Sequence, residues 1–408
     1  MNKKHLSGML LLTLLVSACG KDKGNNNNDD VTQYPPVETQ NPNTSYTPAF
    51  QGQTRIYGIK TQAELDVKVL REGLQAPWGL VALPNGNWLV TQKNGTMLVL
   101  NADGSTKSTI NGLPAVNSGG QGGLLGVALD PQFANNRMVY WTFSENVSGG
   151  TVTAVAKGML AENEGSISNI DVIYRAMPAY QGQLHYGGRL VFDQTGNLLV
   201  STGERSDLVT RPLAQDKSTG LGKILRITRE GQAAPGNPFA NDPDALPELY
   251  SYGHRNVQGL TYDAQTNALW EVEFGPRGGD EVNKVEAGKN YGWPTITYGI
   301  EYGGGVIGDG LTQKEGMEQP VYYWDPSVSP SGTVFYNADY HTEWKGNLLI
   351  ACLSGQHIVR LRIQNGKVAG EERLLSTENQ RFRDVAVGID GKLYAITDQG
   401  RLYQVGKL

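Results

Sequence analysis

The chain has few cysteines, no concentrated positive charge and no long apolar run, and each shortage excludes a class of protein. Two cysteines in 408 residues, Cys19 and Cys352, rule out a disulfide framework. A net charge of -5 without a basic cluster argues against a nucleic-acid partner, because phosphate binding needs a concentrated positive face. The apolar run from Leu6 to Val16 is too short to span a bilayer as a permanent helix.

The first residues have the pattern of an export signal. Lys3 and Lys4 precede the apolar run, which fits the core of a secretory signal. The run ends in Val16-Ser17-Ala18-Cys19, and small residues directly before a cysteine resemble a bacterial lipobox; an ordinary signal peptide is the alternative. Gly20 stands where such signals use aspartate for inner-membrane retention. We therefore predict a lipoprotein signal peptide over residues 1–18 and a lipid on Cys19 that anchors an exported protein, with the outer membrane favoured.

A polar segment follows the predicted anchor. It contains four asparagines and two aspartates, residues 25–30, and few apolar side chains, so it cannot bury enough surface to offset its ordering entropy. We predict that residues 19–57 form a flexible tether. Cys352, alone once Cys19 carries lipid, is predicted to be a buried apolar residue.

Glycine and short apolar segments dominate the rest of the chain. With 52 glycines and 19 prolines, many short strands joined by turns are expected rather than long helices. Six segments share one pattern of an apolar strand, a polar turn and a second strand, which is typical of a radial repeat. We predict an all-β, six-bladed β-propeller of four-stranded antiparallel blades over residues 58–408, with two stacked sandwiches as the weaker alternative. The six segments begin at Trp78, Leu125, Gly188, Gln258, Ser331 and Arg383.

Closure of such a ring needs a strand from each end of the chain. Residues 65–70 alternate like a strand ahead of the first repeat, and residues 401–405 form the last strand of the final repeat. We expect the two to pair, which removes the open sheet edge.

Polar motifs recur where the repeats end, and their loops meet at one end of a propeller channel. Five of them, GQGGLLGVALDPQF, LHYGGRL, YGHRNVQGL, GDEVNKVEAGKNYGWP and RFRDV, resemble the glucose/sorbosone dehydrogenase family, the soluble quinoprotein aldose dehydrogenases that bind pyrroloquinoline quinone (PQQ). The resemblance runs from about Val67 to the C-terminus, with the motifs in the family's order.

The resemblance implies a catalytic set and a cofactor site. His185 would be the general base that takes the proton of the anomeric hydroxyl while hydride passes to the quinone, a role that suits imidazole. Arg255 and Asn256 would stabilise the oxyanion that develops on the quinone. Arg381 and Arg383, two apart on an expected strand, would share one face and bind carboxylates or carbonyls. The expected quinone-binding residues are Gln121, Glu204, Arg255, Asn256, Trp324, Arg381 and Arg383.

The resemblance also implies Ca²⁺. The backbone carbonyls of Gly275 and Pro276 match the position that holds the cofactor's calcium, where a hard cation polarises the quinone. Glu281 and the main-chain carbonyl of Tyr291 match a second, structural calcium. Judged by composition alone, these acids equally suit the capping of a turn.

Two departures weaken the match, and other functions stay open. Residues 351–356 contain no cation where some relatives carry a quinone-binding lysine, and Phe274 replaces a glutamine.

The expected activity is oxidation of the anomeric carbon of an aldose mono- or oligosaccharide to a lactone, with electrons passing to a periplasmic acceptor. The alternatives are a non-catalytic carbohydrate- or protein-binding propeller that recognises its ligand through Trp324, Tyr186 and Tyr291, or a calcium-dependent lactonase. The sugar is not specified; loops 176–183 and 298–319 are expected to select it.

Overall fold

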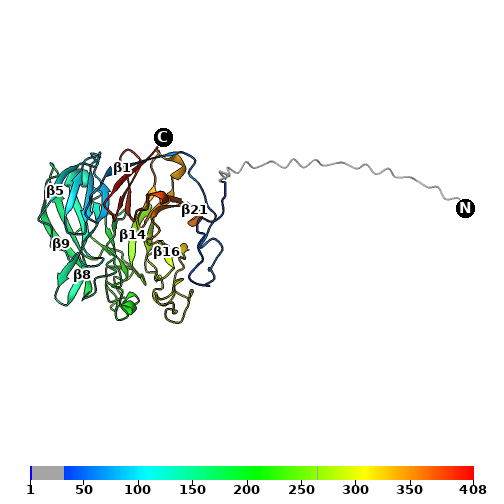
Figure 1. Ribbon diagram of the computed structural model, residues 1–408. Helices are drawn as coiled ribbons and strands as arrows, with labels where there is room; N and C mark the ends of the chain where they lie inside the picture. Colours follow the sequence, from blue (N-terminus) through cyan, green and yellow to red (C-terminus); the bar gives the residue numbers. More distant parts are fainter. Residues whose placement is uncertain (2–31, 264) are drawn as a thin grey trace. The chain divides into compact units, whose positions relative to one another are not determined.

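The computed structural model describes residues 1, 32–263 and 265–408 (Figure 1). The predicted signal peptide, Met1 apart, and the predicted anchor Cys19 lie outside the described residues. Within the described part of the chain, no helix combines the length and the apolar character needed to cross a membrane.

Four-stranded antiparallel sheets account for the regular structure of the described residues, and there are six of them. Each predicted repeat supplies the first two strands of one sheet, as its strand–turn–strand pattern requires. The first three sheets are β2 (Pro77–Ala82), β3 (Trp88–Gln92), β4 (Met97–Leu100) and β5 (Thr106–Ile110); β6 (Leu124–Leu129), β7 (Met138–Val147), β8 (Gly150–Leu160) and β9 (Ile167–Tyr180); and β10 (Leu190–Phe192), β11 (Leu198–Ser201), β12 (Lys223–Ile227) and β13 (Leu249–Tyr252).

The second half of the chain repeats this arrangement. Helical segments are short: α1 (Phe133–Asn136), η1 (Arg211–Ala214), η2 (Thr342–Trp344) and η3 (Ser376–Glu378). The remaining sheets are β14 (Val257–Asp263), β15 (Ala268–Glu273), β16 (Asp280–Val285) and β17 (Tyr322–Trp324); β18 (Pro330–Tyr336), β19 (Asn347–Cys352), β20 (His357–Gln364) and β21 (Lys367–Leu374); and β22 (Phe382–Val387), β23 (Leu393–Thr397), β24 (Leu402–Lys407) and β1 (Leu65–Arg71).

The six sheets are the blades of a propeller. The first strands of neighbouring blades contact one another all the way round, from β2 through β6, β10, β14 and β18 to β22 and back to β2. A separate apolar cluster fills each of the six interfaces between blades. Trp88 of the first blade, for example, packs on Tyr394 of the last with ring centroids 4.4 Å apart. The six-bladed propeller predicted from the repeats is confirmed.

The last blade combines both ends of the domain. β1 pairs with β24 in antiparallel register, with Leu65 opposite Lys407 and Val67 opposite Val405. The edge that β24 would expose is thereby covered, as predicted.

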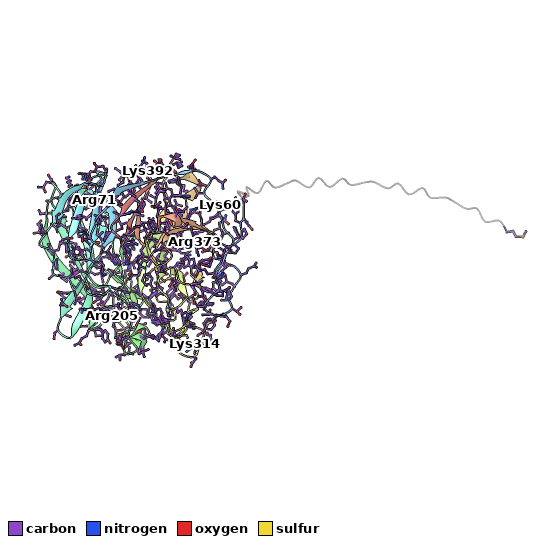
Figure 2. The ribbon with its side chains drawn as sticks, in the orientation of Figure 1. Lys60, Arg71, Arg205, Lys314, Arg373 and Lys392 are labelled. Atoms are coloured by element: carbon purple, nitrogen blue, oxygen red, sulfur yellow. The ribbon has the colours of Figure 1, made fainter. Side chains whose placement is uncertain are left out.

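Residues 33–58, which we call the N-terminal arm, differ from the predicted flexible tether. Tyr34 and Gly58 exchange backbone hydrogen bonds of 2.9 and 2.8 Å, and Glu38 forms an ion pair with Arg373 of β21. Figure 2 shows Lys60, just beyond the arm, and Arg373 on the same flank of the propeller. The composition was misleading because specific hydrogen bonds, together with packing of Ile56 against the core between the fourth and fifth blades, hold this segment.

Loops gather at one end of the propeller. Arg205, after β11, and Lys314, after β16, both lie at the lower end in Figure 2. The connections that carry the predicted site residues enter the cavity described next.

Candidate active site

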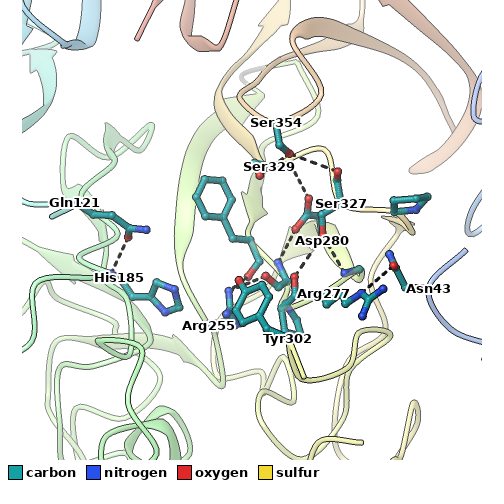
Figure 3. A pocket seen from close by; sticks show the side chains of 15 residues that line it. Asn43, Gln121, His185, Arg255, Arg277, Asp280, Tyr302, Ser327, Ser329 and Ser354 are labelled. Atoms are coloured by element: carbon teal, nitrogen blue, oxygen red, sulfur yellow. Dashed lines mark hydrogen bonds between the residues drawn. The ribbon is translucent and has the colours of Figure 1, made fainter. Parts of the chain in front are cut away.

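The cavity that contains most of the predicted catalytic residues, called the main cavity below, has a volume of about 390 Å³, within the range of small-molecule sites. Loops from several blades line it, and so does the N-terminal arm (Figure 3). Of the predicted residues it contains Gln121, His185, Arg255, Gly275 and Pro276. The others are Asn43, Phe274, Arg277, Gly278, Asp280, Tyr302, Pro326, Ser327, Ser329 and Ser354.

A second cavity of about 230 Å³ adjoins the first, since Gln121 and Phe274 line both. Three cations line it, Lys93, Arg381 and Arg383, against a single acid, Asp398. The combined space therefore has a cationic part, suited to a ligand with carboxylates, and a part that contains a histidine.

The backbone around His185 is held in an uncommon conformation. His185 has φ +46°, in the left-handed region, and its carbonyl approaches Gly203 so closely that a Cβ there would lie 2.3 Å from the oxygen. Arg205 fixes the same loop: its Nε donates to the Leu184 carbonyl at 3.0 Å and its Nη1 to the Thr151 carbonyl at 2.9 Å. From the sequence, Arg205 stands out only as part of the polar segment Gly203-Glu204-Arg205, with no role of its own.

His185 and Glu204 form a buried pair. Nδ1 of His185 lies 2.6 Å from Oε1 of Glu204, and the two residues are 4% and 1% exposed. Burial, with the nearby charge of Arg255, lowers the pKa of His185 to about 4, although Glu204 acts in the opposite direction. The imidazole is therefore neutral at pH 7; the carboxylate selects the tautomer with the proton on Nδ1 and leaves Nε2 as an acceptor.

Gln121 orients the histidine from the other side. Its Oε1 accepts the backbone N–H of His185 at 2.8 Å, and its own backbone N–H donates to the Gln183 carbonyl at 2.8 Å (Figure 3). The contact gives Gln121, which was expected to bind the quinone, a role in orienting His185, and its amide NH₂ is left for other partners.

Arg255 lines the main cavity, whereas Asn256 is fully buried and lines neither of the two cavities. Nη1 of Arg255 donates to the carbonyl of Gly275 at 2.7 Å. Asn256 lies deeper, where its Oδ1 accepts the backbone N–H of Gly187 at 3.0 Å. Glu273 holds both by accepting their backbone N–H groups at 2.5 and 3.2 Å.

Arg381 and Arg383 both line the second cavity, as predicted, but Arg381 lies just before β22 and not on the strand itself. Nε of Arg381 lies 3.1 Å and Nε of Arg383 2.9 Å from the carboxylate of Asp398. Burial of Asp398 acts to raise its pKa, but the two guanidinium groups hold that pKa below its ordinary value.

Lys93 was missed from the sequence. It follows β3 in the first blade, and its Nζ donates to the Gly120 carbonyl at 2.7 Å. Burial and the charge of Arg383 lower the pKa of its ammonium group, which marks it as part of the cationic wall. The first blade therefore provides a cation to the second cavity, whereas residues 351–356, where some relatives carry a lysine, provide none.

The predicted cofactor-calcium ligands, Gly275 and Pro276, lie at the edge of the main cavity. Asp280 fixes this loop and its neighbour by accepting the backbone N–H groups of Gly275, Val328 and Ser329 at 2.8, 2.7 and 2.7 Å. Because Arg255 already donates to the Gly275 carbonyl, a bound ion has to share that oxygen.

The second predicted calcium position is a small closed space. Glu281 and Tyr291 line a cavity of about 10 Å³ together with Glu273, which is room for one particle the size of a water molecule. Burial, and then the charge of Glu273, raises the pKa of Glu271 and of Glu281 well above the ordinary value. No lysine or arginine of the described residues forms an ion pair with these three acids, although Arg255 also lines the cavity, so oxygen ligands outnumber the cations there.

Trp324 is not part of the site. Its indole is 2% exposed, packs in the core between the fourth and fifth blades, and donates to Glu371 at 3.3 Å. The prediction was wrong because Trp324 closes β17, the last strand of its blade, where its side chain turns into the interface between blades. Tyr186 and Tyr291 are buried as well, so the recognition surface proposed for a binding module does not exist.

The chain is similar to known proteins over most of its length. The family model described as Glucose / Sorbosone dehydrogenase matches residues 74–404. The aldose sugar dehydrogenase YliI of Escherichia coli (strain K12) is 40% identical over 348 residues, which is 84% of this chain and 93% of the relative. The soluble aldose sugar dehydrogenase of Escherichia coli in its apo form superimposes with a TM-score of 0.80 at 39% identity, covering 84% of this chain and 100% of the other. The PQQ-bound aldose sugar dehydrogenase of Streptomyces coelicolor gives a TM-score of 0.69 at 33% identity, covering 85% and 99%.

Proposed function

Because the chain belongs to the glucose/sorbosone dehydrogenase family, we propose that it is a PQQ- and calcium-dependent dehydrogenase that oxidises the anomeric carbon of aldose sugars to lactones. One observation carries the proposal. A buried neutral histidine, fixed by a carboxylate, lines a cavity that continues into a wall of three cations. A relative with the same fold was solved with PQQ bound, which supports the choice of cofactor.

The residues present fit a flat tricarboxylate. Lys93, Arg381 and Arg383 would bind its carboxylates, and the Gln121 amide and Arg255 would contact its ring. Two buried donors near them, Nε of Arg255 and Nδ2 of Asn256, have no hydrogen-bond partner among the described residues, as expected of a site that is completed by a ligand. When bound, PQQ supplies the acceptor for the hydride that leaves C1 of the sugar.

The protein's own contribution is proton transfer and charge placement. Nε2 of His185 takes the proton of the anomeric hydroxyl, and the imidazolium that forms is stabilised by Glu204 at Nδ1. Arg255 places positive charge where negative charge accumulates on the acceptor. Burial of the pair excludes water, so Glu204 acts across a low dielectric.

Calcium fits at two positions. At Gly275 and Pro276 an ion would polarise the acceptor as a Lewis acid, bound by carbonyl oxygens. At Glu281 and the Tyr291 carbonyl an ion would neutralise the buried acids and link β16 to the loop after it.

We further propose export and anchoring through a lipid on Cys19, with the outer membrane as the site and a periplasmic carrier as electron acceptor. The lipobox-like Val16-Ser17-Ala18-Cys19 supports this location.

The test is reconstitution of the purified protein with PQQ and Ca²⁺, followed by dye reduction with a panel of aldoses. Activity is expected, and His185→Ala is expected to lower kcat by about 10²- to 10⁴-fold, the usual contribution of a general base. Absence of PQQ binding at micromolar concentration would overturn the proposal. If sugar binds without being oxidised, the protein is a binding module instead.

A further inference from the structure

The N-terminal arm contributes to the site from outside the residues that the family model matches. The family model begins at residue 74, whereas the arm occupies residues 33–58. Even so, Asn43 of the arm lines the main cavity beside residues of the fourth blade. A segment that precedes the matched residues therefore contributes a polar side chain to the candidate active site.

One buried carboxylate fixes this part of the arm. Asp325 accepts the backbone N–H and the side-chain amide of Asn43 at 2.9 and 2.8 Å, and the backbone N–H and hydroxyl of Thr44 at 3.0 Å each. Arg55 donates to the backbone carbonyl of Asp325 at 2.7 Å. Five hydrogen bonds at one residue place Asn43 in a defined position at the cavity wall.

Asn43 in turn positions an arginine that has no acid to bind. Nε of Arg277 donates to Oδ1 of Asn43 at 3.1 Å (Figure 3). Arg277 is exposed, lines the cavity and forms no ion pair within the described residues. Four of its five N–H donors are therefore available to a ligand.

The arm also supports the loop expected to select the sugar. The side chain of Gln53 is buried and donates to the Pro320 carbonyl at 2.9 Å, while its Oε1 accepts the hydroxyl of Tyr298 at 3.1 Å. The backbones of Arg277 and Ile300 exchange hydrogen bonds of 3.0 and 3.1 Å. These contacts bring Tyr302, which is 70% exposed, to the cavity.

Asn43, Arg277 and Tyr302 lie away from His185, where the reaction is proposed to occur. Figure 3 shows His185 and Asn43 on opposite sides of the cavity, with Arg277 next to Asn43 and Tyr302 between. With a sugar ring at His185 and the quinone and calcium at Gln121, Arg255, Gly275 and Pro276, the wall formed by Asn43, Arg277 and Tyr302 still has no assigned ligand. Amide and guanidinium donors beside an exposed aromatic ring match the hydroxyl-rich edge and apolar face of another sugar ring.

We propose that Asn43, Arg277 and Tyr302 form a subsite for a second sugar unit, so that the enzyme prefers reducing disaccharides to monosaccharides. The proposal rests on the proposed sugar dehydrogenase function. The reducing ring lies at His185, and the hydroxyls of the second ring accept hydrogen bonds from the Arg277 guanidinium that Asn43 holds in place.

The test compares maltose with glucose on the full-length protein reconstituted with PQQ and Ca²⁺. Asn43→Ala is expected to lower the ratio of kcat/KM for maltose to kcat/KM for glucose about fivefold, the value of one hydrogen bond, and Arg277→Gln to lower it about tenfold. Asn41→Ala is the matched control, since Asn41 is an exposed asparagine of the same arm outside the cavity. If Asn43→Ala fails to fold, Arg277→Gln carries the test, because the Asn43–Asp325 contacts stay intact.

Calorimetric titration of maltose and glucose separates this proposal from the function on which it rests. Turnover of both sugars with an unchanged ratio in Asn43→Ala and Arg277→Gln overturns the subsite and leaves the dehydrogenase standing. Tighter binding of maltose than of glucose that both variants lose, without turnover in the wild type, supports the subsite and overturns the dehydrogenase. If the wild type neither binds nor oxidises either sugar, both proposals fall.

Discussion

Replacement of Glu204 by glutamine tests the chemistry of the buried pair. The amide oxygen of a glutamine still accepts the Nδ1 proton of His185, so the tautomer and the ring orientation are kept. What is lost is the negative charge 2.6 Å from the imidazole, in a place where both side chains are almost fully buried. The variant therefore isolates the electrostatic role of Glu204 from its positioning role.

The size of the effect follows from that contact. A hydrogen bond to a charged partner is worth about 1.5 to 3 kcal/mol, and this bond is charged on both sides once His185 has taken the proton. At about 1.4 kcal/mol per factor of ten, kcat/KM is expected to fall about 10- to 150-fold. Since Glu204 raises the pKa of His185, its neutralisation lowers that pKa below the present value of about 4. The acid limb of the pH profile is then expected to move to lower pH.

The assay is dye-linked aldose oxidation between pH 3 and 8 with the PQQ-loaded protein, and saturation with PQQ is checked separately. Glu162→Gln is the control, because Glu162 is exposed and remote from the cavity. A Glu204→Gln enzyme with wild-type kcat/KM, or with its acid limb at higher pH, would refute the assignment of His185 as a base assisted by Glu204.

Three further predictions concern the cofactor, the metal and pH. Lys93→Met is expected to weaken PQQ binding about 10- to 150-fold in a fluorescence titration, the loss of one charged hydrogen bond, whereas Lys314→Met, at an exposed position, changes nothing. Calcium is expected to raise the Tm of the wild-type protein more than that of Glu281→Gln, which keeps only the position at Gly275 and Pro276; an equal rise in both would exclude the small cavity as a site. The folded-state pKa of His185, about 4, lies below the unfolded value of 6.5, so the unfolded chain binds the extra proton between these values. This proton is therefore expected to lower the free energy of unfolding by roughly 3 kcal/mol as pH drops from 6.5 to 4, measured by urea denaturation as the difference between the wild type and His185→Gln. The difference is needed because the raised pKa values of Glu271 and Glu281 act in the opposite direction; a difference that does not change with pH would contradict burial of a neutral His185.

The fold was predictable because each of the six sequence repeats corresponds to one blade. Each strand–turn–strand segment appears as the first two strands of a blade, and the closing strand at residues 65–70 pairs as expected. His185, Gln121, Arg255, Arg381 and Arg383 reach one continuous site because blade-end loops converge at the channel.

What the sequence did not predict depends on side-chain direction and on contacts between distant segments. Trp324 was expected to bind the quinone, but it ends β17, and its side chain lies in the apolar core between two blades. Lys93 gives no signal of its own, since only ring closure brings the first blade beside the last. The sequence of the arm gives no sign of an ordered segment, because its order depends on hydrogen bonds to distant residues. Asp325, which accepts hydrogen bonds from Asn43, lies 282 residues away from it.

The pairing of β1 with β24 has a consequence for the order of events during synthesis. Of the strands in the propeller, β1 is synthesised first and β24 last, so the final blade stays incomplete until all the other blades have been made. Five blades can form while the chain grows, but β1 has no partner strand until residues 402–407 are available. A nascent chain of this protein therefore has an unpaired strand for most of its synthesis. Deletion of residues 402–407 is expected to leave two unpaired strand edges, at β1 and β23, and a protein prone to self-association.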